Sequence, residues 1–322
     1  MTTEHTTTDR PVLVLARSLP EPLLQALGEL GHTRLLTADP DSLAGAKVLV
    51  ATAVDPVPQA LIERFPASLQ LIAILGVGTD GVDLAAAARR GIAVSNTPVV
   101  TEDTADLTMA LLLASCRRLS ACERLLRQGD WAAGASQLGR RVHGKTLGII
   151  GFGAIGQAVA RRARGFGMSI VYHGPRRKAE AEAELQARYR SDLAELLAEA
   201  DVVSLNCPLT PATRHLLNRD SLARTKPGAI LINTGRGPLI DEAALVEALA
   251  SGHLGGAGLD VFEFEPDISP ALREFENVTL LPHIGSATAE CRLDIAMRAI
   301  GNIKAFLQHG NPVDRCLPVG TV

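Results

Sequence analysis

A glycine-rich turn in the middle of the chain constrains the fold more than any other feature. An apolar, strand-forming segment at 145–150 runs into a G-x-G-x-x-G turn made by Gly151, Gly153 and Gly156, and a helical pattern follows over 157–165. This spacing between a strand and a helix is typical of dinucleotide binding, whereas elsewhere it indicates only a turn. Gly151 permits the tight turn, Gly153 lets the backbone approach a pyrophosphate, and Gly156 lets the helix pack close to the strand. The helix N-terminus then presents unpaired N–H groups to the phosphates.

The turn begins at residue 151 of 322, so a folded unit is expected before it. A chain of this length commonly forms two domains. In its first part, apolar runs that predict strands alternate with segments that predict helices. The expected strands are 12–15, 48–50, 71–75 and 91–94, and the expected helices are 21–30, 59–64 and 82–90. This alternation predicts a parallel sheet with helical crossovers, and therefore a small α/β domain.

A second α/β unit is expected after a break at Asn96-Thr97-Pro98. One long, mostly buried helix is expected over 103–128, and the last helix, 289–308, would cross back onto the first domain with no strand after it. The six expected strands are 145–150, 169–172, 202–205, 229–232, 256–259 and 278–281. Six strands with helices between them match a doubly wound sheet.

We therefore expect an α/β protein made of two Rossmann-like, doubly wound parallel-sheet domains with a cleft between them. The substrate-binding domain would be flavodoxin-like and discontinuous, formed by 1–100 and 288–322. The dinucleotide-binding domain would be 101–287.

Composition excludes several classes of protein. The chain has 47% hydrophobic residues and a net charge of −3, and its longest apolar stretch, 107–116, is too short to span a membrane. The start, 1–10, is threonine-rich without an apolar signal core, so we expect a loose, untargeted tail and a cytoplasmic protein. The only tight basic cluster, 176–178, has no interleaved aromatic residues, which argues against nucleic acid. Five scattered cysteines show no metal-binding or redox spacing, so reduced thiols and no metal are expected.

The segment after the second strand of the dinucleotide-binding domain bears on the choice of cofactor. In NAD binders an acidic residue about 20 positions past the glycines binds the ribose hydroxyls. Gly174 stands there instead, and Arg176, Arg177 and Lys178 follow it. Arginines bind a 2′-phosphate, which a carboxylate would repel. The sequence favours NADP(H) over NAD(H); the alternative is that these cations form a solvated helix start and NAD(H) binds.

Three polar side chains follow strands of the second sheet, where ligands of doubly wound sheets bind. They are Arg236, Glu265 and His283. An arginine can hold a substrate carboxylate with two donors, and an imidazole can donate a proton near neutral pH. A carboxylate beside the imidazole favours its protonated form. These residues predict the reduction of a 2-keto acid by hydride from a nicotinamide.

Each of the three residues has a plainer interpretation as well. A histidine after a strand is commonly a loop or core residue, an arginine between glycines a solvated turn, and Glu-Pro a loop entry. Three other histidines also flank the second sheet, namely His143, His173 and His253. Spacing alone leaves these alternatives open.

Taken in order, the motifs resemble the signature of the D-2-hydroxyacid dehydrogenases. The matching segments are 151–156, 233–237, 258–262 with Glu265-Pro266, and 282–286. The resemblance runs from about Leu71 to Phe306 and is greatest to the glyoxylate/hydroxypyruvate reductases, with the related 2-ketogluconate and hydroxyphenylpyruvate reductases.

The resemblance implies roles for individual residues. Arg236 would bind the substrate carboxylate, His283 would be the general acid and base, and Glu265 would be its partner. Substrate binding would also involve Val77, Gly78 and Ser286, with the backbone amides around Val77 and Gly78 meeting the carboxylate. The cofactor would be lined by Thr108, Gly151, Gly153, Ala154, Ile155, Gly156, Gly174, Arg176, Arg177, Cys207, Thr213, Thr234, Arg236, Asp260, His283 and Gly285.

Two further implications concern the cofactor phosphate and the assembly. Gly174-Pro175 departs from the Ser/Asn-Arg pair frequent in members that use NADPH, so Arg176 and Arg177 would hold the phosphate. The long helix after Thr97 would serve the interface of a homodimer.

The expected activity is NADPH-preferring reduction of a small or polar 2-keto acid, such as glyoxylate, hydroxypyruvate or 2-ketogluconate, to the D alcohol. Aromatic residues make up only 3% of the chain, which disfavours hydroxyphenylpyruvate. A nucleotide-sensing binding protein, like the co-repressors built on this fold, is the rival from another class. An L-2-hydroxyacid dehydrogenase is excluded because its glycine turn would lie near the N-terminus.

Overall fold

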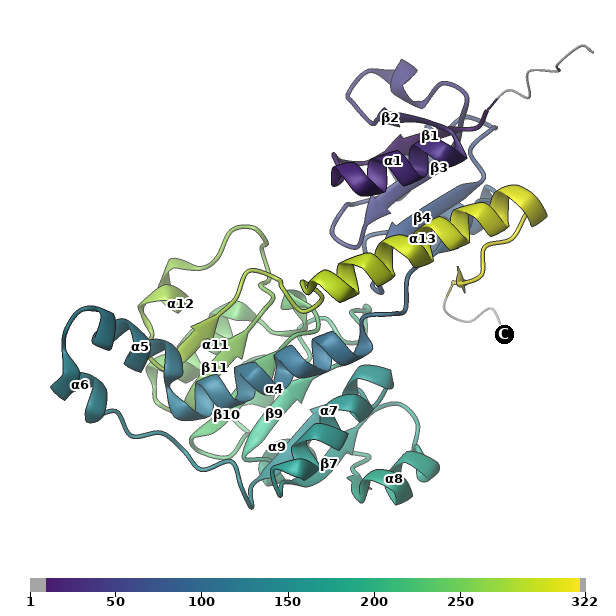
Figure 1. Ribbon diagram of the computed structural model, residues 1–322. Helices are drawn as coiled ribbons and strands as arrows, with labels where there is room; N and C mark the ends of the chain where they lie inside the picture. Colours follow the sequence, from purple (N-terminus) through teal and green to yellow (C-terminus); the bar gives the residue numbers. More distant parts are fainter. Residues whose placement is uncertain (1–9, 319–322) are drawn as a thin grey trace, which may run out of the picture. The chain divides into compact units, whose positions relative to one another are not determined.

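The computed structural model describes residues 10–318, which form two compact units (Figure 1). The first unit consists of two segments, the residues up to Val100 and those from Thr288 onward. The second unit is Thr101–Ala287. Most of the threonine-rich start, residues 1–9, lies outside the described residues. Within 10–318, no helix combines the length and the apolar character needed to cross a membrane.

The first unit is a sheet of six strands in the order β13-β5-β4-β3-β1-β2. All neighbours are parallel except β13, which pairs antiparallel with β5. The order of the first five strands is that of flavodoxin-like sheets. The strands are β1 (Val12–Leu15), β2 (His32–Leu35), β3 (Ala46–Thr52), β4 (Leu71–Leu75), β5 (Ala93–Ser95) and β13 (Arg315–Cys316).

Helices cover both faces of this first sheet. On one face α1 (Glu21–Leu30) and α13 (Ala289–His309) share a core with β1, β3 and β4, to which α13 contributes the buried Ile303 and Phe306. The other face packs against α2 (Gln59–Glu63) and α3 (Leu84–Arg89), and a 3₁₀ turn, η1 (Pro40–Leu43), precedes β3. Burying a side chain such as Ile303 contributes about 1.5–3 kcal/mol. The end of the chain therefore completes the core that its beginning starts.

The second unit is an all-parallel sheet of seven strands in the order β12-β11-β10-β9-β6-β7-β8. Parallel sheets are buried on both faces, which fits the apolar runs that predicted six of these seven strands. The strands are β6 (Thr146–Ile150), β7 (Ser169–His173), β8 (Ala187–Tyr189), β9 (Val202–Leu205), β10 (Ala229–Asn233), β11 (Leu254–Leu259) and β12 (Val278–Leu280).

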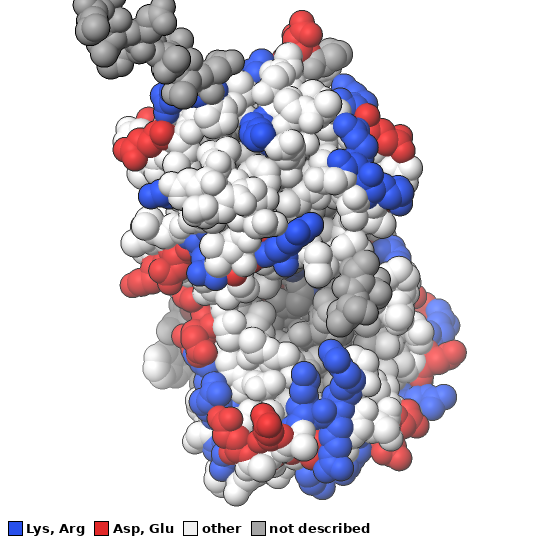
Figure 2. Space-filling model, turned by 90° about the vertical axis from the view of Figure 1, so that its right-hand side faces the viewer, with Lys and Arg blue, Asp and Glu red and all other residues white. Residues whose placement is uncertain are grey.

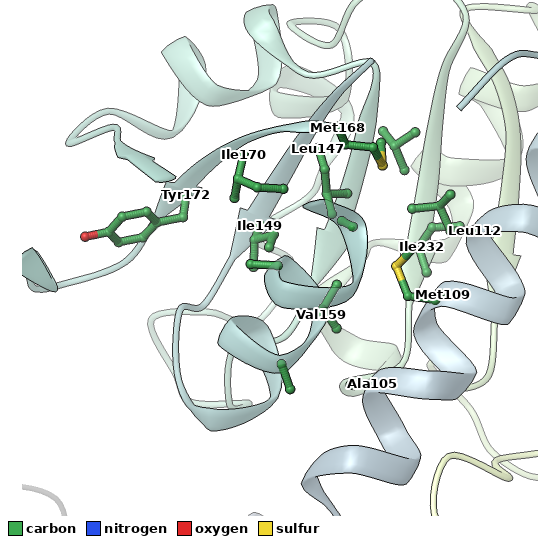
Figure 3. Close-up of a cluster of buried hydrophobic side chains, with 14 of the residues drawn as sticks. Ala105, Met109, Leu112, Leu147, Ile149, Val159, Met168, Ile170, Tyr172 and Ile232 are labelled. Atoms are coloured by element: carbon green, nitrogen blue, oxygen red, sulfur yellow. The ribbon is translucent and has the colours of Figure 1, made fainter. Parts of the chain in front are cut away.

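Two helical layers enclose this second sheet. One contains α4 (Thr101–Arg117), α7 (Ala154–Gly165) and α8 (Ala179–Leu185), and Figure 3 shows Ala105, Met109 and Leu112 of α4 beside the side chains of β6 and Ile232. The other layer covers the opposite face, with a 3₁₀ turn, η2 (Gly237–Leu239), after β10. Its helices are α9 (Leu193–Glu199), α10 (Arg219–Leu222), α11 (Glu242–Ala250) and α12 (Pro270–Glu274).

The predicted single helix over 103–128 is wrong. α4 ends at Arg117, Arg118 adopts a left-handed conformation with φ 54°, and α5 (Leu119–Arg127) then leads to α6 (Trp131–Ala135). Neither glycine nor proline marks this break in the sequence, so the helical pattern runs through it unaltered.

Short edge strands account for the other differences. The predicted sheet of six strands has a seventh, β8, and the first sheet gains β2 and β13, so the last helix does have a strand after it. In β2 and β13 the side chains are exposed or half-buried, and β8 has only three residues. Such segments lack the run of buried apolar residues that predicts a strand.

Candidate active site

The glycine turn lies at the switch point of the second sheet. From β6 the chain proceeds to β7 and β8 on one side, then crosses to β9 on the other, so β6 and β9 are neighbours from which the chain diverges. Ligands of doubly wound sheets bind at the carboxyl ends of strands at such a point. Gly151 directly follows β6, and Asn206 directly follows β9.

Close backbone contacts explain two of the three glycines. Gly151 has φ 96°, and a Cβ there would lie 2.4 Å from the backbone N of Cys207. A Cβ on Gly156 would lie 2.2 Å from the carbonyl O of Gly151. Gly153 precedes α7 with open space around its Cβ position, and no side chain among residues 10–318 caps the helix. The turn therefore fits a dinucleotide, because free N–H groups at the start of α7 face space that a pyrophosphate can enter.

A buried tyrosine connects the glycine turn to the segment after β7. The ring of Tyr172 stacks on Phe152 at 4.0 Å, and its hydroxyl points away from the core in Figure 3. That hydroxyl donates to Glu182 (2.7 Å) and accepts from the N–H of Lys178 (2.7 Å). Burial, together with the bond to Glu182, raises the pKa of Tyr172 to about 12, so it stays a neutral donor.

The two arginines predicted to hold a phosphate differ in their surroundings. Arg177 donates to both carboxylate oxygens of Glu182, with its shortest contact at 2.8 Å. Arg176 is exposed and pairs with no carboxylate of the described residues, and Gly174 uses its carbonyl to accept from Tyr189 (3.0 Å). Figure 2 shows the side of the second unit on which α8 lies in Figure 1. Basic and acidic side chains lie next to one another on this side.

The other residues expected around the cofactor lie at the same edge of the sheet. Thr108 and Thr234 share a hydroxyl–hydroxyl bond of 2.7 Å, which joins α4 to the end of β10. Burial raises the pKa of the Cys207 thiol to about 11, so it is uncharged beside the glycine turn. Thr213 uses its hydroxyl within its own loop, donating to Pro208. Ala154 and Ile155 form the first turn of α7.

Arg236 is carried by a turn that a buried asparagine holds. Asn233, the last residue of β10, accepts from the N–H of Gly235 (3.0 Å) and donates to the carbonyl of Arg236 (2.9 Å). The Arg236 guanidinium itself donates to the Gly235 carbonyl (2.9 Å) and is half-buried. The side chain therefore extends from a fixed backbone.

His283 stands in a strained backbone conformation that Asp260 supports. Its φ is 56°, a left-handed value that costs a residue with a side chain of order 1 kcal/mol or more. Its N–H donates to the carbonyl of Asp260 (2.8 Å). The buried carboxylate of Asp260 accepts from the N–H groups of Ile284 (2.7 Å) and Gly285 (2.8 Å), and Ser286 follows. Burial raises the pKa of Asp260 despite these bonds.

Glu265 and His283 form a pair. The Nδ1 atom of His283 lies 2.8 Å from Oε2 of Glu265, and Oε1 of Glu265 accepts from the N–H of Phe262 (2.9 Å). Burial disfavours the Glu265 carboxylate, but these hydrogen bonds and the charges of His283 and Arg236 outweigh it, so the pKa of Glu265 is lowered. Within the described residues, Nε2 of His283 has no partner. The imidazole is thus oriented at one nitrogen and available at the other, as proton transfer to a ligand requires.

The expected substrate contacts outside this sheet belong to the first unit. Val77 and Gly78 follow β4, and the Val77 carbonyl accepts from the side chain of Asn96 (2.8 Å). The N–H groups of Val77 and Gly78 form no hydrogen bond among the described residues.

Four residues that support the turns of this site were not predicted from the sequence, namely Asn233, His215, Glu242 and Glu263. Asn233 stands at the end of a buried strand, which is the one signal that could have found it. His215, Glu242 and Glu263 have no such pattern, because the partners of each lie on distant segments.

Gly156 and Gly153 give a test of the dinucleotide site. Gly156→Ala should lower the free energy of unfolding by about 1–3 kcal/mol, because the new methyl group meets the Gly151 carbonyl, and should also weaken cofactor binding. Gly153→Ala should leave unfolding unchanged and weaken only cofactor binding, because its methyl group would occupy the space in front of α7. Chemical denaturation of the ligand-free protein and titration with NADPH and NADH measure both effects. Unaltered binding in Gly153→Ala would contradict the assignment, and Gly165→Ala serves as the control on the same helix.

Comparison with known proteins agrees with this geometry. Residues 109–285 match the family described as D-isomer specific 2-hydroxyacid dehydrogenase, NAD binding domain. The chain is 43% identical over 312 residues to the glyoxylate reductase of Thermococcus litoralis, covering 92% of this chain and 94% of that protein. It is 42% identical over 321 residues to glyoxylate/hydroxypyruvate reductase B of Escherichia fergusonii, covering 96% and 98%.

A solved structure agrees as well. The NADPH-dependent glyoxylate/hydroxypyruvate reductase of Sinorhizobium meliloti, in complex with NADP and malonate, superposes with a TM-score of 0.88 at 37% identity, covering 95% of this chain and 97% of that one. The family match, over residues 109–285, includes the glycine turn, Arg236, Glu265 and His283. The chain is an oxidoreductase that belongs to the D-isomer specific 2-hydroxyacid dehydrogenase family.

Proposed function

We propose that this enzyme reduces glyoxylate and hydroxypyruvate to D-2-hydroxy acids and prefers NADPH. The observation that carries the proposal is the His283–Glu265 pair, with Arg236 close enough to lower the pKa of Glu265, at the carboxyl edge of a dinucleotide-binding sheet. The names of the Thermococcus and Escherichia relatives support the choice of substrates. 2-Ketogluconate is the alternative substrate.

In this proposal the side chains divide binding from proton transfer. Arg236 holds the substrate carboxylate with two donors of its planar guanidinium. His283 gives the proton on Nε2 to the keto oxygen, while Glu265 fixes Nδ1 and stabilises the positive imidazolium. The bound cofactor supplies hydride to C2.

The preference for NADPH rests on charge after β7. No carboxylate stands at Gly174, and Glu182 is engaged by Arg177 and Tyr172, so it would not repel a 2′-phosphate strongly. We propose Arg176 as the main phosphate ligand, since Arg177 already has a partner. The Sinorhizobium reductase, described as NADPH-dependent, supports this choice.

We propose further that the enzyme is a cytoplasmic homodimer. Exposed apolar side chains gather on and beside α5 and α6, including Trp131 (73% exposed) and Leu138 (86% exposed). Apolar groups concentrated on one projecting segment are typical of an interface. Within the described residues no cysteine forms a disulfide, which supports a reducing compartment.

Activity tests the function directly. The wild-type protein should oxidise NADPH with glyoxylate and hydroxypyruvate, and Arg236→Ala should lower kcat/KM about 10²- to 10³-fold, because the substrate carboxylate loses its charged partner. Arg219→Ala, which removes an exposed arginine, should have the kcat/KM of the wild-type protein. Cofactor absorbance follows both reactions, with 2-ketogluconate run in parallel. Near-normal turnover by Arg236→Ala would end the assignment, and binding of NADPH without any turnover would favour a nucleotide sensor.

Two variants test the cofactor assignment. Arg176→Ala should raise KM for NADPH about tenfold or more, as expected for a charge-assisted bond, and leave KM for NADH unaltered. Arg161→Ala is the control, since it removes another exposed arginine of the second unit. Steady-state kinetics with each cofactor measure the outcome. A wild-type preference for NADH, or equal effects on both cofactors, would refute the assignment.

Sedimentation tests the dimer. The wild-type protein should sediment as a dimer, and the double variant Trp131→Asp, Leu138→Asp as a monomer, because charges would be buried in the interface. Leu35→Asp places a charge at the position of another exposed leucine (46% exposed), and this variant should still sediment with the mass of a dimer. A double variant that stays dimeric would place the interface elsewhere.

A further inference from the structure

Two glutamates outside the catalytic set are buried at the same edge of the second sheet. The side chain of Glu263 is only 6% exposed, and Glu242, the first residue of α11, is a buried residue. A buried carboxylate is costly unless hydrogen bonds or opposite charges compensate it. The mechanism proposed above uses neither residue, so their burial needs another explanation.

Glu242 binds both stems of the loop that carries Glu265. Its Oε2 accepts from the N–H of Glu263 (3.1 Å), and its Oε1 accepts from the N–H of Ser269 (3.2 Å). Between these two anchor points the chain turns back on itself, with the N–H of Asp267 donating to the carbonyl of Phe264 (2.8 Å). One carboxylate therefore closes the base of the loop, with Glu265 at its exposed tip.

Glu263 ties this loop to two other segments. Its Oε1 lies 2.5 Å from Nε2 of His215 and 3.4 Å from the guanidinium of Arg214, and its Oε2 accepts from the N–H of Glu242 (3.2 Å). The two glutamates thus accept from each other's backbone N–H. The start of α11 and the guanidinium of Arg214 favour the two buried carboxylates, and His215 adds a hydrogen bond to Glu263.

The same residues connect to the turn that carries Arg236. The N–H of His215 donates to the carbonyl of Pro238 (2.8 Å), two residues after Arg236. His215 itself has φ 50°, so its backbone is strained where it makes this contact. A Cβ on Gly237 would lie 1.8 Å from the carbonyl O of Phe262, so the two turns touch through their backbones.

We propose that Glu242 and Glu263 are positioning residues that fix the Glu265 loop against the Arg236 turn, and so hold the Glu265–His283 pair in register. The proposal rests on the function proposed above. Neither glutamate is among the residues proposed to hold substrate or cofactor. Their contribution is to keep the Glu265 carboxylate at hydrogen-bond distance from Nδ1 of His283, where a displacement of about 1 Å can cost about 10²-fold in rate.

The test compares two glutamates of the same helix. In the full-length enzyme, Glu242→Ala should lower kcat about 10- to 100-fold while KM for NADPH stays within about twofold, because the loop moves and the cofactor turn does not. Glu247→Ala removes an exposed carboxylate of α11 that pairs with Arg219, and should behave as wild type. A wild-type kcat in folded Glu242→Ala would overturn the proposal, and so would an equal loss in Glu247→Ala.

Two further measurements keep the test decisive. The rate of amide hydrogen exchange at 263–269 should rise in Glu242→Ala and not in Glu247→Ala. This measurement uses the enzyme without substrate, so it does not depend on which substrate the enzyme reduces. If the wild-type enzyme reduces no 2-keto acid, the proposed function fails while this exchange result still decides the role of Glu242. If Glu242→Ala does not fold, Glu242→Gln, which keeps one acceptor, should give an intermediate kcat and intermediate exchange. Wild-type values of both in Glu242→Gln would then overturn the proposal.

Discussion

The parallel register of the second sheet is the constraint on which the site depends. β9, β10, β11 and β12 end at one edge, so the turns after them lie next to one another although long stretches of sequence separate them. The backbone continues the pairing beyond the strands: the N–H of Asp260 bonds to the carbonyl of Asn233, and the N–H of His283 to the carbonyl of Asp260. A ladder of main-chain bonds therefore runs from the arginine turn to the histidine turn.

Buried polar groups then fix each turn on that ladder. Asn233 holds the arginine turn, and Asp260 holds the histidine turn in a left-handed conformation that the backbone would not adopt unaided. Asp260 shows the balance of forces: burial disfavours its charge, while two N–H groups and His283 favour it. Such groups stabilise the fold only when their bonds are complete, and a site built from them is consequently rigid.

Much of this could be predicted from sequence because the signals are local. The glycine turn, the apolar strands and the polar residues after them each lie within a few positions of one another, and the strands at 12–15, 71–75 and 202–205 have the bounds that were predicted. What escaped prediction depends on partners far along the chain. Glu242 and Glu263 are separated by 21 residues and Glu263 and His215 by 48, and nothing in the segments themselves indicates these pairs. The break at Arg118 escaped because an arginine in a left-handed conformation has no sequence signal.

The discontinuity of the first unit has a consequence for how the protein is made. Its sheet is nearly finished by Ser95, yet the core on one face still lacks Ile303 and Phe306, and the antiparallel edge strand lies at 315–316. On the ribosome this unit must wait with an uncovered apolar face while the whole second unit is synthesised and can fold. The order of folding would then be the reverse of the order of the sequence, with the dinucleotide-binding unit complete before the unit that begins the chain.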